Sequence, residues 1–180
     1  MNEYILIKHS GNINDILTLI RESFGVNAYR IIEEILYIEL EDINEDREFI
    51  LGFFDALAID FNIENVYLGC PYENDEEFNV YFRIFKNLSK VYKGYYVFTI
   101  NDFLKSSFNE LCSYLYKKLI KYEDVIKAMF NSNLVITQAT LKTYYHRNTV
   151  INKINNIKLL TNLDLKNFHH AMIIYRILNK

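Results

Sequence analysis

Polar side chains that could read DNA are concentrated between residues 137 and 156. Asparagine and glutamine carboxamides pair bidentately with adenine edges, and arginine pairs in the same way with guanine. A lysine such as Lys153 can instead hold a backbone phosphate. We therefore expect DNA contacts from the polar residues of this stretch: Thr137, Gln138, Tyr145, His146, Arg147, Asn148, Thr149, Asn152, Lys153 and Asn156.

Two helices with a tight corner between them would present these residues. Thr137 is a suitable N-cap for a first helix of roughly two turns. The corner then falls at Tyr144-Tyr145, and residues 146–149 open a longer helix. Another helix, at about residues 123–131, precedes them. In a helix-turn-helix of this kind, the second helix enters the major groove and touches bases with its first residues.

The longer helix has two different faces. At about 100° per residue, Val150, Ile154 and Ile157 fall on one apolar stripe. The opposite side holds the polar residues Asn148, Thr149, Asn152 and Asn156. The polar face is free to read bases, but a merely solvated face in an asparagine-rich chain would show the same pattern. In that case the unit is a protein-interaction or co-regulator module that has lost DNA binding.

The string HRNTVINKINNIKLLTNLDL, followed by NFHHAMIIYRIL, resembles the C-terminal helix-turn-helix domain of the PucR family of transcriptional regulators, which includes the sugar-diacid regulators. The contiguous HRNT and the LTNLDL corner carry the resemblance, which covers about the last 55 residues. It implies a bacterial-type transcriptional regulator that binds double-stranded DNA. By position, Arg147, Asn148 and Thr149 would face DNA, and His146 at the corner would cap the helix or touch a base.

Basic residues gather in the C-terminal part of the chain. Residues 121–180 hold 9 Lys and Arg against 3 Asp and Glu, whereas residues 1–120 hold 11 against 20. The net charge of -3 therefore conceals +6 in the C-terminal part and -9 in the rest. A basic segment that coincides with the expected helix-turn-helix fits a polyanionic partner, although chance asymmetry would give the same charges.

Length and composition indicate two small globular domains in the cytoplasm. The 180 residues are 51% hydrophobic, and Asp55 and Asp60 interrupt the most apolar stretch, so no transmembrane helix is expected. The first residues show no export signal. Cys70 and Cys112 are isolated and have neither disulfide nor metal-ligand spacing, which fits a reducing compartment.

The N-terminal part predicts a mixed sheet covered by helices. Its periodicity gives the order β-α-β-β-α-β-α-β. Strands are expected at 4–8, 26–32, 34–41, 66–70 and 95–100, and helices at 14–24, 45–61 and 75–92. The helix at 45–61 should bury Phe49, Ile50, Phe53, Leu57 and Phe61. We predict an α+β fold of ferredoxin-like or cyclase-like kind, followed by an all-α helix-turn-helix domain.

This part also resembles the degenerate cyclase-like, GGDEF-related domain that precedes the helix-turn-helix in sugar-diacid regulators. The resemblance covers roughly residues 1–104 and rests on the order of elements and on LGCPYENDEEFNVYFRIFKNL. An active cyclase of this kind carries GG(D/E)EF at its hairpin to hold nucleotide and metal, whereas this hairpin reads YRIIEEILYIEL. We therefore expect a non-enzymatic domain without cofactor, for sensing or dimerisation, with room for a small-molecule effector between sheet and helices.

Other groups of potential metal ligands are expected to be solvated. The carboxylates at Glu33-Glu34, Asp42 and Glu45-Asp46 fit a solvated rim around a hairpin. His169 and His170 are adjacent on one helix, so their side chains point about 100° apart and do not share an ion easily. Neither a metal site nor a catalytic residue is predicted.

A connecting helix and a final helix complete the expected architecture. The connector, capped at Asn101-Asp102, should run through residues 105–122 between domains at 1–104 and 123–180. The final helix is apolar on most sides, which favours a homodimer. Its core-facing residues would be Phe168, Ala171, Met172 and Tyr175, and those meeting a second copy Ile173, Ile174 and Ile177. Alternatively, residues 105–122 of the same chain bury both faces.

Overall fold

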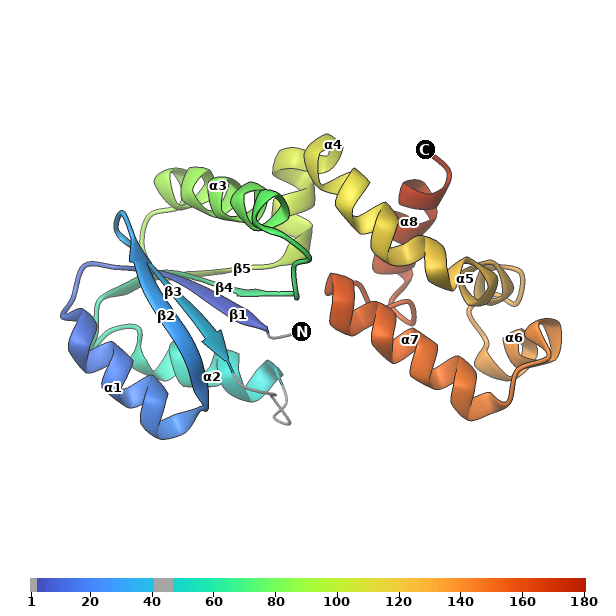
Figure 1. Cartoon of the computed structure of the whole chain (residues 1–180), viewed down its shortest axis with the longest axis horizontal. Coiled ribbons are helices and arrows are strands. Elements are labelled where there is room, and N and C mark those ends of the chain that lie inside the picture. The colour runs from blue at the N-terminus through green and yellow to red at the C-terminus, as the bar shows by residue number, and fades with distance from the viewer. Residues whose placement is uncertain (1–2, 41–46) are drawn as a thin grey trace. The chain divides into compact units, whose positions relative to one another are not determined.

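The computed structural model describes residues 3–40 and 47–180, which fold as two compact units divided between Ser107 and Phe108. We refer to them as unit 1 and unit 2. No helix within these ranges is long and apolar enough to cross a membrane. The elements in chain order are β1 Tyr4–His9, α1 Ile13–Ser23, β2 Val26–Ile32, β3 Ile35–Leu40, α2 Arg47–Leu57, β4 Ile63–Gly69, α3 Asp75–Val91, β5 Tyr96–Phe98, α4 Ile100–Leu119, the 3-10 helix η1 Ile120–Tyr122, α5 Glu123–Phe130, α6 Ile136–Thr143, α7 Arg147–Thr161 and α8 Phe168–Leu178 (Figure 1).

Unit 1 is built on a five-stranded sheet with the order β2-β3-β1-β4-β5. Strand β1 runs antiparallel to both β3 and β4, β2 runs antiparallel to β3, and β5 joins β4 in parallel. The first four strands with α1 and α2 form the split βαβ arrangement of ferredoxin-like folds, to which α3 and β5 are added. The predicted α+β fold and the predicted order of its elements are confirmed.

Helices cover both faces of this sheet, with α1 and α2 on one side and α3 on the other (Figure 1). On the first face, Ile7 of β1 packs in one apolar core with Ile20 of α1 and Phe54 of α2. The second face is aromatic, and the rings of Tyr67 and Phe103 stack with their centroids 4.0 Å apart. The first four residues of β1, Tyr4 to Ile7, are buried and form a continuous apolar run rather than an alternating one, as expected where both faces of a sheet are covered.

Helix α2 departs from the apolar stripe that we expected. It ends early, at Leu57. The buried side chains are Ile50 and Phe54, together with Ala58 just after the helix, whereas Phe49, predicted to lie inside, is 58% exposed. Buried positions spaced by four residues follow one side of a helix, and Phe49 lies one residue off that side. The predicted start at residues 45–46 lies outside the described residues.

The connector α4 begins earlier than predicted and is interrupted. Thr99 directly precedes the helix, and the predicted Asp102 completes the cap from the first turn: the Thr99 hydroxyl and backbone N–H donate to Asp102 Oδ2 at 2.7 and 2.8 Å. This cap shortens the strand expected at 95–100 to three residues. Inside α4, Ser107 has non-helical torsions (φ -146°, ψ 51°), so the connector is broken where the two units divide.

Unit 2 contains α5, α6 and α7, which pack on one another, and α8. The predicted core face of α8 is confirmed at Ala171 and wrong at Phe168, Met172 and Tyr175. Asn167 caps α8 by accepting from two backbone N–H groups, which sets its start, and the side chains turned into the core are Ala171, Ile174 and Ile177. Small Ala171 in this stripe allows close approach to the core. The large apolar side chains left outside are Phe168, Met172 and Tyr175.

Candidate nucleic-acid interface

Helix α6 presents exposed polar side chains. It begins directly after Val135, which has no side-chain cap, so Thr137 is not the N-cap that its position suggested. The positive φ angles of Asn133 and Leu134, 51° and 63°, turn the chain so that the helix starts before Thr137. Thr137 and Gln138 therefore lie in the first turn of α6, where both are exposed.

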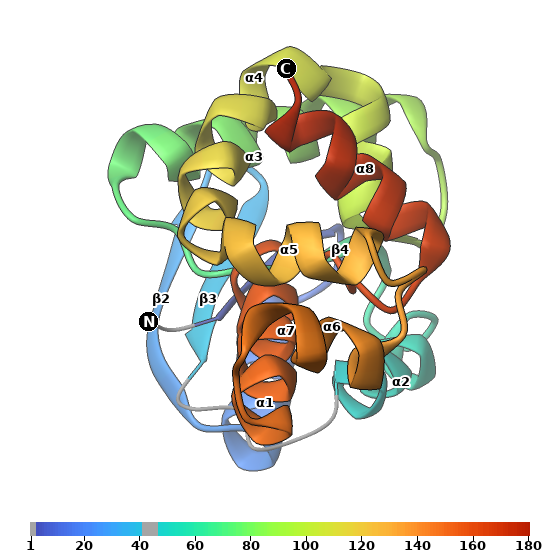
Figure 2. The same ribbon diagram turned by 90° about the vertical axis from the view of Figure 1, so that its right-hand side faces the viewer.

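The corner between α6 and α7 is made by a left-handed residue. Tyr144 ends α6 with φ 57° and ψ 17°, and its side chain is 95% exposed. The Thr143 hydroxyl accepts from the Tyr145 N–H at 3.4 Å and lies 3.1 Å from the Ala139 carbonyl, to which it can donate. The tight corner predicted here is present, and Figure 2 shows α6 and α7 on the side of unit 2 that faces the viewer.

His146 caps the start of α7. Its Nδ1 accepts from the Asn148 N–H at 3.3 Å, and its carbonyl accepts from the Thr149 N–H at 2.9 Å. The side chains of Arg147, Asn148 and Thr149 are exposed on the first turn. Because a helix N-terminus carries a partial positive charge, this turn combines a favourable potential for phosphate with side chains that can bond to bases.

The two faces of α7 agree with the spacing of its residues. Val150, Ile154 and Ile157 are at most 1% exposed. Asn152 and Asn156, on the other side, are exposed. Burial of each aliphatic side chain contributes about 1.5 to 3 kcal/mol, so the apolar stripe determines which face of α7 is left in solvent.

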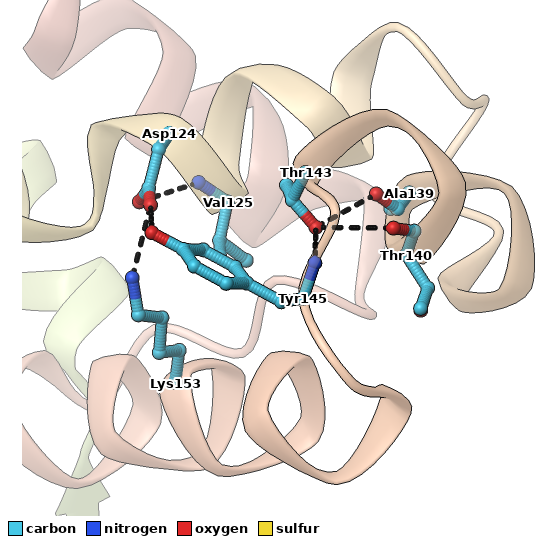
Figure 3. A network of polar contacts seen from close by, with 7 residues as sticks. All are labelled: Asp124, Val125, Ala139, Thr140, Thr143, Tyr145 and Lys153. Atoms are coloured by element: carbon cyan, nitrogen blue, oxygen red, sulfur yellow. Dashed lines mark hydrogen bonds and ion pairs between the residues drawn. The ribbon is translucent and has the colours of Figure 1, made fainter.

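Asp124 of α5 joins the corner to α7 (Figure 3). Its Oδ2 accepts from the Tyr145 hydroxyl at 2.6 Å and from the Lys153 ammonium at 2.9 Å. The other carboxylate oxygen accepts from the Val125 N–H at 2.7 Å. Lys153 Nζ also lies 4.2 Å from the centroid of the Tyr145 ring. Tyr145 and Lys153, both expected to contact DNA, thus have internal partners.

The sequence did not indicate Asp124 as a residue of this site, because acidic residues are common in the first turn of any helix, where they complement the helix dipole. Partial burial by itself would raise the pKa of the Asp124 carboxyl, but the hydrogen bonds from Tyr145 and Lys153 outweigh it and lower that pKa. Burial would lower the pKa of Lys153, yet its hydrogen bond to Asp124 raises it. Both groups are therefore charged at neutral pH.

Several cations near α7 are already paired within unit 2. Lys127 and Lys158 lie 2.8 and 3.5 Å from carboxylate oxygens of Glu123 and Asp164. By contrast, the guanidinium of Arg147 is exposed and makes no hydrogen bond or ion pair with any residue in the described ranges. Arg147 is therefore a cation at the start of α7 that is available to a ligand.

The corner after α7 depends on His170. Asn162 ends α7 in the left-handed conformation, with φ 60°. The Asp164 N–H then donates to His170 Nδ1 at 3.0 Å. Burial lowers the pKa of His170, which favours the neutral ring that can accept this bond.

Of the potential metal ligands considered above, Glu33, Glu34, His169 and His170 lie in the described part of the chain. Among the side chains that the structure describes, no three His, Cys, Asp or Glu are placed to hold an ion. Glu33 forms an ion pair with Lys86. Asp42 and Glu45-Asp46 lie outside the described residues.

Comparison with known proteins places the helical region in a domain family. Residues 123–178 match the model of the PucR C-terminal helix-turn-helix domain. No curated protein sequence matches the chain. Among solved structures, a regulator of polyketide synthase expression from Bifidobacterium adolescentis aligns over 99% of this chain and 79% of its own, at 12% identity and a TM-score of 0.39. The family match, rather than that likeness, shows that α5 to α8 form a PucR-type helix-turn-helix domain.

Proposed function

We propose that this chain is a DNA-binding transcription regulator in which α7 is the recognition helix. The observation that carries the proposal is the match of residues 123–178 to the PucR helix-turn-helix domain. The exposed, unpaired Arg147 on the first turn of α7 supports it. The excess of basic over acidic residues after residue 120 supports it as well, because such a segment attracts a polyanion.

In this proposal the first turn of α7 touches bases in the major groove. Arg147 pairs with guanine, Asn148 pairs with adenine, and Thr149 bonds to either a base or a phosphate. Asn152 and Asn156 continue the same exposed face. They adjust sequence preference and add little to the total affinity, because they lie beyond the end of the helix that enters the groove most deeply.

The residues around α7 have supporting roles. Thr137 and Gln138 contact phosphates, since the first helix of such a unit crosses the DNA backbone. Tyr145 and Lys153 act indirectly, because their bonds to Asp124 hold the start of α7 in place. In this proposal the positive charge of Lys153 pairs with Asp124 of the same chain rather than with a DNA phosphate.

Fluorescence anisotropy of the full chain with duplexes that tile the DNA flanking its own gene tests this function. One duplex should bind more tightly than a random duplex of equal length, and affinity should fall as salt rises. If no duplex binds at low salt, where electrostatic attraction is strongest, the chain is not a DNA-binding regulator. A co-regulator or protein-interaction module is then favoured, because the apolar side chains outside α8 suit a protein partner.

We also propose a homodimer that forms through α8. Phe168, Met172 and Tyr175 recur at i, i+4 and i+7 and are 47 to 64% exposed, which makes an apolar stripe along the helix. A two-fold contact through this stripe would give the assembly two recognition helices, as paired half-sites require. Light scattering should report twice the chain mass of 21.5 kDa. Met172→Glu should return the monomer.

For unit 1 we propose a non-catalytic, cyclase-like domain that senses a small effector. The ferredoxin-like strand order supports the relationship. The β2-β3 hairpin turns at Glu33, with φ 57°, where it lacks glycines that let phosphates approach. A cavity of about 300 Å³ lined by residues including Lys8, Glu34 and Lys90 offers room for the effector. Thermal-shift screening of metabolites tests this role, and a flat screen would favour control by abundance or by a partner protein.

A further inference from the structure

Tyr144 adopts a backbone conformation that disfavours a bulky residue. Its torsions, φ 57° and ψ 17°, lie in the left-handed region, where the Cβ atom crowds the following carbonyl and which glycine and asparagine tolerate best. Helix α7 ends in nearly the same conformation, with φ 60° and ψ 12°, and places Asn162 there. The left-handed position at the helix end is thus occupied by asparagine, which tolerates it, after α7 and by tyrosine after α6.

Packing does not compensate for this conformation. At 95%, Tyr144 is the most exposed large hydrophobic side chain in the described ranges. Its ring and hydroxyl make no hydrogen bond or ring contact with any residue there. Leu134, which is also left-handed with φ 63°, is half-buried and so gains contacts from its side chain. The fold therefore offers no reason for a tyrosine at position 144.

The position of Tyr144 relative to α7 does offer a reason. Tyr144 precedes the capping residue His146 by two positions and Arg147 by three. A recognition helix enters the groove by its N-terminus, so the chain that leads into it passes the phosphate backbone. Thr137 and Leu141, which are four residues apart in α6 and so lie on one face of that helix, are exposed as Tyr144 is.

We propose that Tyr144 contacts the DNA backbone, with its phenol hydroxyl donating to a phosphate oxygen. This inference rests on the proposed function and adds to it a contact that carries no charge. Tyrosine hydroxyls are among the groups that bind phosphates in protein–DNA interfaces, and such contacts carry no sequence information. A neutral donor neutralises no phosphate and releases no counterion. The contact should therefore strengthen binding to any duplex without steepening its salt dependence.

Two substitutions of Tyr144 in the full chain separate the contact from a role in folding. Tyr144→Phe keeps the ring and removes the donor, so affinity should fall about two- to tenfold on the best flanking duplex and on random DNA alike. The slope of log affinity against log salt should stay the same. Tyr144→Gly should bind at least as weakly as the Phe variant and yet raise the melting temperature, because glycine suits the left-handed conformation. Tyr116→Phe, which alters a 40% exposed tyrosine of α4, is the matched control and should bind like the parent.

Each other outcome overturns the inference in a recognisable way. Parent-like binding by Tyr144→Phe removes the hydroxyl contact, whatever Tyr144→Gly does. A loss on the flanking duplex alone reassigns Tyr144 to base reading. Weak binding by Tyr144→Gly together with a lower melting temperature means that Tyr144 acts through folding. A parent chain that binds no duplex at low salt overturns the proposed function itself, and with it the contact.

Discussion

Replacement of Asp124 by asparagine should loosen the attachment of α7 to α5. The change keeps an oxygen acceptor for Tyr145 but removes the charge that lies 2.9 Å from the Lys153 ammonium. Two unit charges at this separation interact by about 1.4 kcal/mol in water and by about 6 kcal/mol at an effective dielectric constant of 20. Because the Asp124 side chain is 43% exposed, solvent screening should reduce the net contribution to about 1 kcal/mol.

Hydrogen–deuterium exchange of the full chain measures this contribution. A loss of about 1 kcal/mol makes local opening roughly fivefold more frequent, so amides near residues 150–157 should exchange about fivefold faster in Asp124→Asn. Exchange is resolved peptide by peptide, which separates unit 2 from unit 1. Lys158→Met is the matched control. It removes an ion pair with Asp164 at 3.5 Å in which the lysine side chain is 57% exposed, and it should change exchange much less.

A double-mutant cycle of Asp124→Asn and Lys153→Met decides whether the ion pair is responsible. We expect a coupling energy of about 0.5 to 1 kcal/mol, and a value of zero would refute the reasoning. The lowered pKa of Asp124 adds a pH check. A carboxylate with a lowered folded-state pKa stabilises the fold above its unfolded value and loses that effect as pH falls through the folded value. The difference between variant and parent should therefore vanish in acid.

The remaining predictions also concern unit 2. Arg147→Ala should weaken binding to the best flanking duplex by about 1 to 3 kcal/mol and to random DNA much less. Equal losses in anisotropy would contradict base reading. Lys153→Met should leave the salt slope unchanged, whereas a slope lower by about one unit would assign Lys153 to a phosphate. His146→Ala removes the N-cap of α7 and should cost about 1 kcal/mol, or about 4 to 8 °C in melting temperature, with His146→Asn restoring most of it. Burial lowers the pKa of His170, so the unfolded chain binds a proton first as pH falls. Urea midpoints should therefore drop below about pH 6.5, and His170→Gln should flatten this dependence.

The order of elements in unit 1 was predictable because periodicity is a local property of the chain. Strand β1 opens with an apolar run from Tyr4 to Ile7, and α1 and α3 show helical spacing, so each element could be recognised alone. The buried side of α2 was not predictable. Helix α2 contains the adjacent aromatic residues Phe53 and Phe54, so its sequence is compatible with more than one apolar stripe. Contact with the sheet selects Ile50 and Phe54 and leaves Phe49 outside.

In unit 2, too, some features could be predicted from residue spacing and others could not. The cap made by His146 and the apolar stripe of Val150, Ile154 and Ile157 involve residues within a few positions of one another, so their spacing determined them. The side of α8 that enters the core depends on the neighbouring helices. Spacing therefore did not tell Ile174, which is buried, from Met172, which is not.

Residue spacing was enough to predict a helix-turn-helix whose second helix opens at His146 and exposes Arg147, Asn148 and Thr149. The contacts of Tyr145 and Lys153 depend instead on long-range packing. Lys153 lies 29 positions from Asp124 in the chain, yet the packing of α5 against α7 brings their side chains to 2.9 Å. A lysine on a polar face suits a phosphate and a carboxylate equally well, because both are anions. Which one it meets is decided by how the helices pack, and that information is not local to the lysine.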